Sequence, residues 1–276
     1  ISDSELKITK SSSSSVPASK ITAKVQAGAV SDSLCNLYEL DSDGNTGSVV
    51  LAFDRTDDEG FVNIDVGKIT YSGSAVIECS GGSYIDEATL EVVQRANDYI
   101  TKVMVKEVSS DGVEESYPVT MHTTIATDLV ASFIQDDIEL DEAIDASNEM
   151  TAGVFGLESI LSIPEELTTS EVDAESSSSL VAQSLASICS LAKELDVTCD
   201  DYMKSVVSDI GADGESDGMA GDEVVTEIKS RTSGKVVALP KGSDWSGRLK
   251  TAHQNWLEDT TIKKGPGIKE LDKLPS

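Results

Sequence analysis

The sequence predicts an α+β protein of several parts: a seven-stranded β-sandwich, then an α-helical domain and an extended C-terminal tail. Three observations support this prediction. Apolar residues alternate with a period of two up to about Thr124, the spacing then becomes helical, and the last 48 residues show little sustained periodicity. With 276 residues, the chain has room for two domains of ordinary size. The predicted parts are an N-terminal strand with a serine linker, the sandwich, the helical domain and a basic extended tail, at 1–15, 16–124, 125–228 and 229–276.

The first ten residues, ISDSELKITK, place Leu6 and Ile8 on one face of a short predicted strand. The serine run 11–15 follows as a flexible linker. A strand on such a tether can pair with the sheet edge of another copy. A frayed N-terminus is the alternative that these residues leave open.

Seven short segments up to position 124 have the alternation of strands, and Gly, Asp, Asn and Ser clusters separate them. The segments are 21–26, 33–40, 47–55, 61–67, 74–81, 101–109 and 114–123. Turn signals at intervals of 8 to 12 residues predict that these strands form a β-sandwich. Residues 86–98 are compatible with either one helix or a long loop.

Four later segments have helical spacing, and a polar interruption at 163–178 divides them into two pairs. The predicted helices are 126–135, 140–156, 179–195 and 198–210, the last two forming an αα-hairpin. The apolar stripe of the third helix is interpreted as core. A Gly/Asp loop at 211–223 follows the hairpin.

Charge is distributed unevenly along the chain. Residues 1–228 have 11 basic and 45 acidic side chains, which gives 11 − 45 = −34, whereas residues 229–276 have 10 basic and 5 acidic ones, which gives +5. A basic tail that also holds both tryptophans is predicted to dock on an acidic surface, either of its own body or of the next copy. The predicted subunit-interface residues are Trp245, Trp256, Arg248, Lys250, Lys263 and Lys264, together with Leu6 and Ile8.

The four cysteines fall into two groups, Cys35 with Cys79 and Cys189 with Cys199. Each group lies within one predicted domain, so two disulfides inside domains are expected, although four cysteines permit three connectivities. The alternative for Cys35 and Cys79 is that they are small core residues on strands.

Composition and motifs argue against several classes of protein. A net charge of −29 is unsuited to nucleic acid, and no run of 18 apolar residues exists to span a membrane. His122 and His253 are the only histidines, and the chain contains no HExxH, CxxC or G-x-S-x-G motif and no Gly-rich phosphate loop. We therefore expect no enzyme, no catalytic residues, no metal site and no cofactor.

Two acidic loops have oxygen ligands of the kind that calcium binds, namely carboxylates. The loop at 41–47 has Thr46 where an EF-hand needs glycine, and the loop at 213–218 meets Val224 in place of the final acid. Both are predicted to be turns.

A resemblance to a known group appears in SLCNLYELDSDGNTGSVVLAFDRTDDEGFVNIDVG and the following SAVIECSGGSYIDEATLE. These segments resemble bacterial exported proteins with a carboxypeptidase-regulatory-like, or transthyretin-like, sandwich, with counterparts at 41–47, 57–61 and 81–89. The resemblance covers roughly residues 20–220. It implies an exported or cell-surface protein with a sandwich and a helical domain, and it brings no active site. Cys35 and Cys79 stand where that pattern has aliphatic strand residues, which favours an added disulfide.

The sequence therefore favours a secreted or cell-surface structural protein that is processed from a signal-peptide precursor, since the chain opens on Ile1. Its predicted partners are copies of itself, joined through the terminal segments into a surface filament. The alternative is a cell-surface binding module for a glycan, calcium or another protein, with Tyr38, Tyr84 and the acidic loops as its binding residues.

Overall fold

The computed structural model describes residues 19–110, 115–135, 138–167, 176–220, 223–224 and 227–259. Nine strands precede the first helix, so the α+β class predicted from the sequence is confirmed. The strands are β1 Lys20–Val25, β2 Leu34–Leu40, β3 Thr46–Arg55, β4 Phe61–Asp65, β5 Gly73–Ser80, β6 Ser83–Ile85, β7 Val92–Gln94, β8 Ile100–Val108, β9 Glu115–Val119, β10 Met219–Ala220 and β11 Glu223–Val224. The helices are α1 Met121–Gln135, α2 Leu140–Phe155, α3 Ser177–Glu194, α4 Cys199–Asp213 and α5 Gly242–Glu258.

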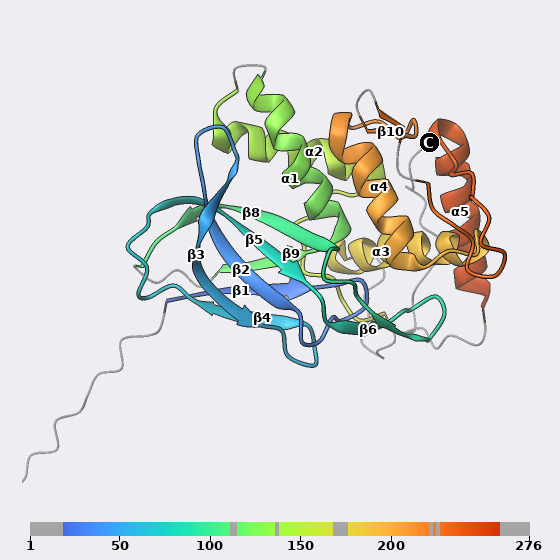
Figure 1. The fold of residues 1–276 in the computed structure, drawn as a ribbon, viewed down its shortest axis with the longest axis horizontal. Helices are drawn as coiled ribbons and strands as arrows, with labels where there is room; N and C mark the ends of the chain where they lie inside the picture. Colours follow the sequence, from blue (N-terminus) through green and yellow to red (C-terminus); the bar gives the residue numbers. More distant parts are fainter. Residues whose placement is uncertain are drawn as a thin grey trace, which may run out of the picture.

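Two sheets build the β-rich end of the molecule, away from α5 (Figure 1). The four-stranded sheet is antiparallel, in the order β3-β2-β5-β8. In the three-stranded sheet β1 lies in the middle, antiparallel to β4 and parallel to β9. Leu37 and Ile77 of the first sheet belong to the same buried cluster as Ile21 and Ile64 of the second. The two sheets therefore share one core, as strands with one apolar face require.

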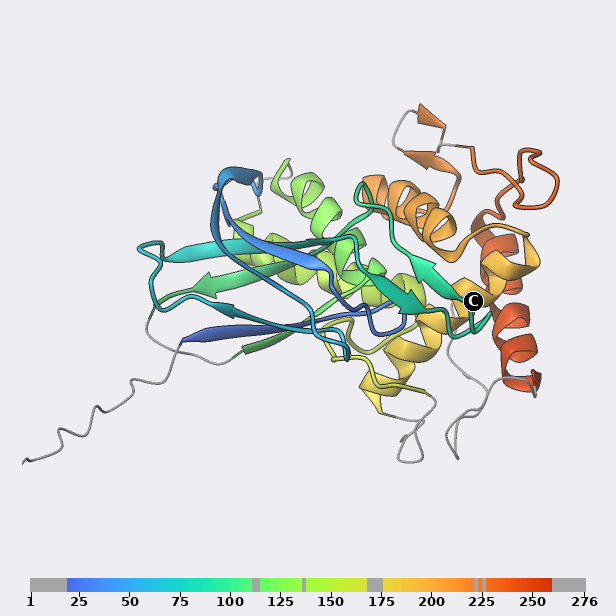
Figure 2. The same cartoon turned by 60° about the horizontal axis from the view of Figure 1, so that its bottom comes forward.

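Helices α1 and α2 cover part of the outer face of the four-stranded sheet (Figure 2). Val76 of β5 and Met104 of β8 form a second buried cluster there with Val130 of α1 and Ile144 of α2. Phe53 of β3, at the opposite edge of the sheet, is exposed. The outer face is thus covered on its β8 side and open on its β3 side.

Two segments differ from the sequence-based expectation around the last strands. Residues 86–98 contain neither one helix nor only a loop, because β7 pairs with β6 in a short hairpin. The strand predicted at 114–123 ends at Val119, and α1 begins at Met121. The physical reason is local capping: Thr123 Oγ1 accepts a hydrogen bond from the Thr120 amide at 2.9 Å, and Thr120 Oγ1 accepts one from the Thr123 amide at 3.3 Å.

Helix α3 is the central helix of the α-rich end, and the main core cluster runs from β1 through α3 to α5. Its N-terminus is capped by Ser176, whose hydroxyl accepts from the Ser179 amide. Thr198 caps α4 in the same way, through the Asp201 amide. None of the described helices is both long and apolar enough to cross a membrane.

The prediction of an extended tail from residue 229 needs correction, because Gly242–Glu258 forms α5. Trp245, Leu249, Ala252 and Trp256 are buried on one side of this helix. Their spacing of four, three and four residues is the helical period. Two glycines and a high proportion of polar residues hide this period when the sequence is scanned for apolar runs.

Candidate assembly site

The four cysteines form two disulfides, with the pairing expected from their positions, and no cysteine is free. Cys35 and Cys79 are partners in the β2–β5 register, with Cα atoms 4.1 Å apart. Cys189 of α3 and Cys199 at the start of α4 have Cα atoms 4.7 Å apart. Paired cysteines of this kind are typical of extracellular proteins.

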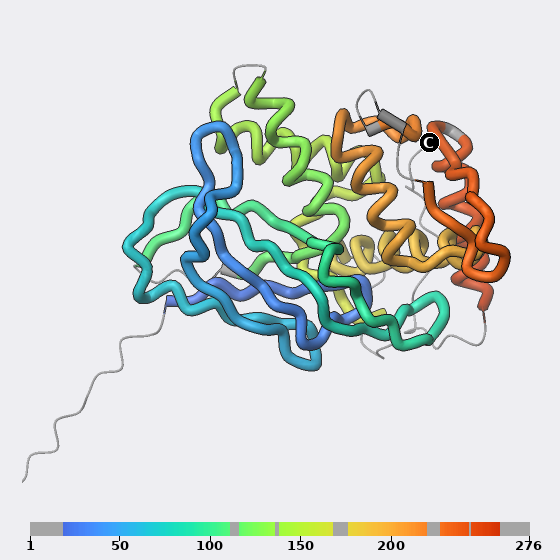
Figure 3. Tube along the Cα trace, viewed as in Figure 1, coloured from blue at the N-terminus to red at the C-terminus, as the bar shows by residue number. Residues whose placement is uncertain are grey.

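Helix α5 packs against α3 of its own chain, where Figure 3 shows the two segments side by side. Trp245 is 4% exposed and Trp256 is 2% exposed. The Trp245 ring meets Phe155 edge-to-face with centroids 5.6 Å apart, and Trp256 Nε1 donates to the carbonyl oxygen of Glu87 at 3.3 Å. The sequence left two docking surfaces open for this segment, the body of its own chain and that of the next copy. In the structure α5 docks on its own chain.

Apolar burial holds this segment more than charge does. Arg248 and Lys250 are half-buried. Among the described residues, one ion pair joins a basic tail residue to an acidic body residue, Arg231 with Glu91 at 3.2 Å, and both side chains are well exposed. The predicted interface residues Leu6, Ile8, Lys263 and Lys264 lie outside the described residues.

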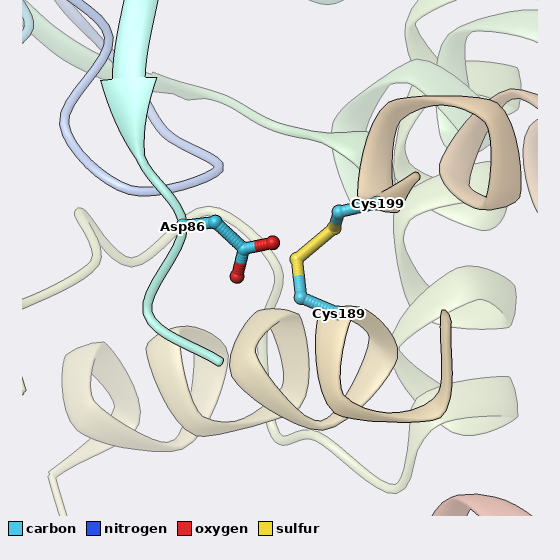
Figure 4. A group of neighbouring side chains, drawn as sticks. All are labelled: Asp86, Cys189 and Cys199. Atoms are coloured by element: carbon cyan, nitrogen blue, oxygen red, sulfur yellow. A yellow bond between two sulfur atoms is a disulfide. The ribbon is translucent and has the colours of Figure 1, made fainter. Parts of the chain in front are cut away.

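A buried polar group lies where the β6–β7 hairpin meets α3 and α4. Figure 4 shows the carboxyl group of Asp86 turned toward the Cys189–Cys199 disulfide. Potential ligand atoms of these three residues lie within 4.8 Å of one another, the one such group among the described residues. The two sulfurs are bonded to each other and so are not thiolates, the form that binds metals. Burial raises the pKa of the Asp86 carboxyl above its ordinary value.

The tyrosines of the alternative binding function have little free ring surface. Tyr84 is buried, and its hydroxyl donates to Asp200 at 2.8 Å. Tyr38 is half-buried beside the cluster formed by α1 and α2. The acidic loop at 41–47 is closed by its own atoms, since the Asp41 carboxylate accepts from the Asp43 and Asn45 amides at 2.9 Å. These contacts hold Asp41 in a turn and lower its pKa.

Both histidines are buried between helices. His122 Nε2 lies 3.0 Å from the Ser184 hydroxyl, and His253 Nδ1 lies 2.7 Å from the Ser187 hydroxyl, so both contacts are to α3. Burial lowers the pKa of His122 to about 3, so its ring is neutral at physiological pH. These rings therefore contribute to the packing of α3 and face no open cleft.

Because His122 is buried and neutral, its own contribution to stability should fall in mild acid, whereas the raised pKa of Glu87, about 8, acts in the opposite direction. The pKa of His122 is about 3 in the folded chain against an ordinary 6.5, so between these values the unfolded chain binds more protons. The contribution of His122 to the free energy of unfolding should fall by about 2–3 kcal/mol when the pH is lowered from 7 to about 4.5. Urea unfolding at both pH values should show a smaller fall for His122→Gln than for the wild type. Equal falls in the two proteins would contradict the assignment.

The edge strand β3 exposes three apolar side chains. Among the described strands, β3 pairs only with β2, and its other side has no strand partner. Val49, Val50 and Phe53 are 57%, 42% and 68% exposed. Val50 pairs in register with Tyr38, and Phe53 with Asn36, which places both on the outer face of the sheet.

Residues 46–53 of this strand, TGSVVLAF, contain no charged residue and no proline. Charges and prolines are the usual means by which edge strands avoid pairing with other chains. β3 ends in Asp54 and Arg55, and its register with β2 shifts twice between Leu37 and Leu40. The apolar run 49–53 precedes those charges and is the part of the edge that is open to strand addition. The sequence predicted this strand but not its edge position, because strand order depends on pairing between distant segments.

Comparisons with known proteins add no assignment. No protein-family model matches the sequence, and no curated protein matches it. Among solved structures, the chain is similar to a 9R-lipoxygenase from Cyanothece PCC8801, with 12% identity over 54% of this chain and a TM-score of 0.23. The match spans 26% of the lipoxygenase chain. A likeness this weak carries no argument about fold or activity.

Proposed function

We propose that this chain is an exported, non-enzymatic structural protein whose copies assemble into a filament at the cell surface through the free edge of β3. The observation that carries the proposal is the exposed, uncharged strand at 46–53. The two disulfides support an oxidising compartment outside the cytosol. If the strand meets a different surface of the next copy, the contact does not close on itself, and a filament results.

The proposal places the contact at β3 rather than at the tryptophans, because α5 already covers both indole rings within its own chain. A net charge of −29 makes the bodies of two copies repel each other. Backbone hydrogen bonds and apolar contacts along an edge act at short range and do not depend on that charge. Assembly should therefore be examined at about 0.15 M salt or more, where repulsion is screened beyond about 8 Å.

Phe53→Lys should convert the assembled protein into a monomer, because it places a charge on the exposed apolar edge. The apparent dissociation constant should rise by at least about tenfold, measured by size-exclusion chromatography with light scattering and by negative-stain microscopy. Val92→Lys is the matched control, since Val92 on β7 is also 68% exposed. It should assemble like the wild type. A wild type that stays monomeric at all concentrations, or a Phe53→Lys variant that assembles normally, would refute the proposal.

A further inference from the structure

We infer that the strand added to β3 is residues 5–10 of a second copy, ELKITK, so that each copy gives one strand and accepts another. This inference rests on the proposed function and names the partner of the same edge. Eighteen residues precede the described body, which begins at Ser19 directly before β1. They include a segment that alternates as a strand does, with Leu6 and Ile8 two positions apart.

Each strand has two apolar side chains for one face of the sheet. Val50 and Phe53 are three residues apart because the β2–β3 register shifts between them, and Leu6 and Ile8 are two apart. Val50 and Phe53 occupy successive register positions on the outer face of the sheet, because they pair with Tyr38 and Asn36. A strand laid along the free edge presents alternate residues to that face. Leu6 and Ile8 would then lie beside Val50 and Phe53, and apolar cross-strand neighbours stabilise a sheet.

The charges on the two segments are also complementary. β3 lies between two acidic turns, with Asp41 and Asp43 before it and Asp57 and Asp58 after it, all exposed. The segment 5–10 has two lysines and one glutamate. The lysines would therefore add positive charge to the contact with a body whose net charge is strongly negative.

Residues 5–10 are joined to β1 through a serine-rich tether. Residues 11–18 span at most about 26–29 Å when extended, since each residue covers about 3.3–3.6 Å. We take a second copy as the acceptor, because a segment paired with its own β3 would cover the edge on which the proposed assembly depends.

Two full-length variants test the inference by complementation. Leu6→Lys/Ile8→Lys removes the donated strand and keeps β3, whereas Val50→Lys/Phe53→Lys blocks β3 and keeps the donated strand. Each variant alone should be a monomer with the circular dichroism spectrum of the wild type and one cooperative melting transition. An equimolar mixture should form one-to-one dimers that do not grow further, since each dimer joins one intact donor to one intact acceptor. Light scattering after mixing measures this directly.

The other outcomes separate this inference from the proposed function. If Leu6→Lys/Ile8→Lys assembles like the wild type while Val50→Lys/Phe53→Lys is monomeric, the edge is the contact and residues 5–10 are not its partner. If a monomeric wild type aggregates only after Leu6 and Ile8 are replaced, the segment covers β3 of its own chain, which overturns the exchange between copies. A mixture that stays monomeric also overturns it. A wild type that is monomeric with every variant refutes both proposals.

Discussion

Trp256→Ala should lower the free energy of unfolding by about 3–5 kcal/mol, the range for truncating a large buried aromatic side chain. Trp256 is 2% exposed and lies on the face of α5 that packs into the main core cluster. The substitution leaves a cavity and also removes the donor to the Glu87 carbonyl oxygen. Urea denaturation followed by circular dichroism measures the change.

Gln254→Ala is the matched control for this experiment, because Gln254 lies on the exposed side of the same helix. It should change stability by no more than about 0.5 kcal/mol, as is usual for surface positions. If Trp256→Ala changed stability as little as Gln254→Ala does, α5 would not belong to the core. In that case the tail would be available to bind another copy.

The double substitution Cys35→Ala/Cys79→Ala should cost about 4 kcal/mol of stability, more than the loss of the other disulfide. Cys35 and Cys79 are 44 residues apart, and the entropy that a disulfide removes from the unfolded chain grows with the length of the loop it closes. Cys189 and Cys199 are 10 residues apart, so Cys189→Ala/Cys199→Ala should cost about 3 kcal/mol. Unfolding of the three proteins in urea compares them.

Intact mass before and after reduction provides the control for the pairing. The wild type should gain four hydrogens on reduction and each double variant two, since the chain has no free cysteine. A larger loss of stability for the shorter loop would show that strain or packing, rather than loop entropy, dominates the effect of these disulfides.

Much of the fold could be predicted because its signals are local. Seven of the strands and the first four helices lie close to the segments with apolar periods of two and of 3.6, as at 47–55 and 140–156. The β6–β7 hairpin was missed because its strands have three residues each. In its turn Leu90 has φ 58°, a conformation that is unusual for leucine, so the residue type at this position does not predict the turn.

Some features of the candidate assembly site could be predicted from the sequence and others could not. Cysteine pairing was predicted from the distribution of four residues along the chain, and the tryptophans were recognised as anchors. Helix α5 was missed, although its stripe of Trp245, Leu249, Ala252 and Trp256 was available in the sequence. The free edge of β3 had no local signal, because β3 becomes an edge only when β2 pairs with β5 on its other side.

The docking of α5 has a consequence for biosynthesis. Its apolar side chains join a core that also contains residues of β1, so that core stays incomplete until residue 256 has been synthesised. Until then, the apolar surface of α3 that α5 will cover is exposed to solvent. A chain truncated before α5 would leave this surface exposed. Incompletely folded chains with bare apolar surface are the ones that aggregate or are held by chaperones. Synthesis of α5 is therefore the step at which this core can close and its apolar surface leave the solvent.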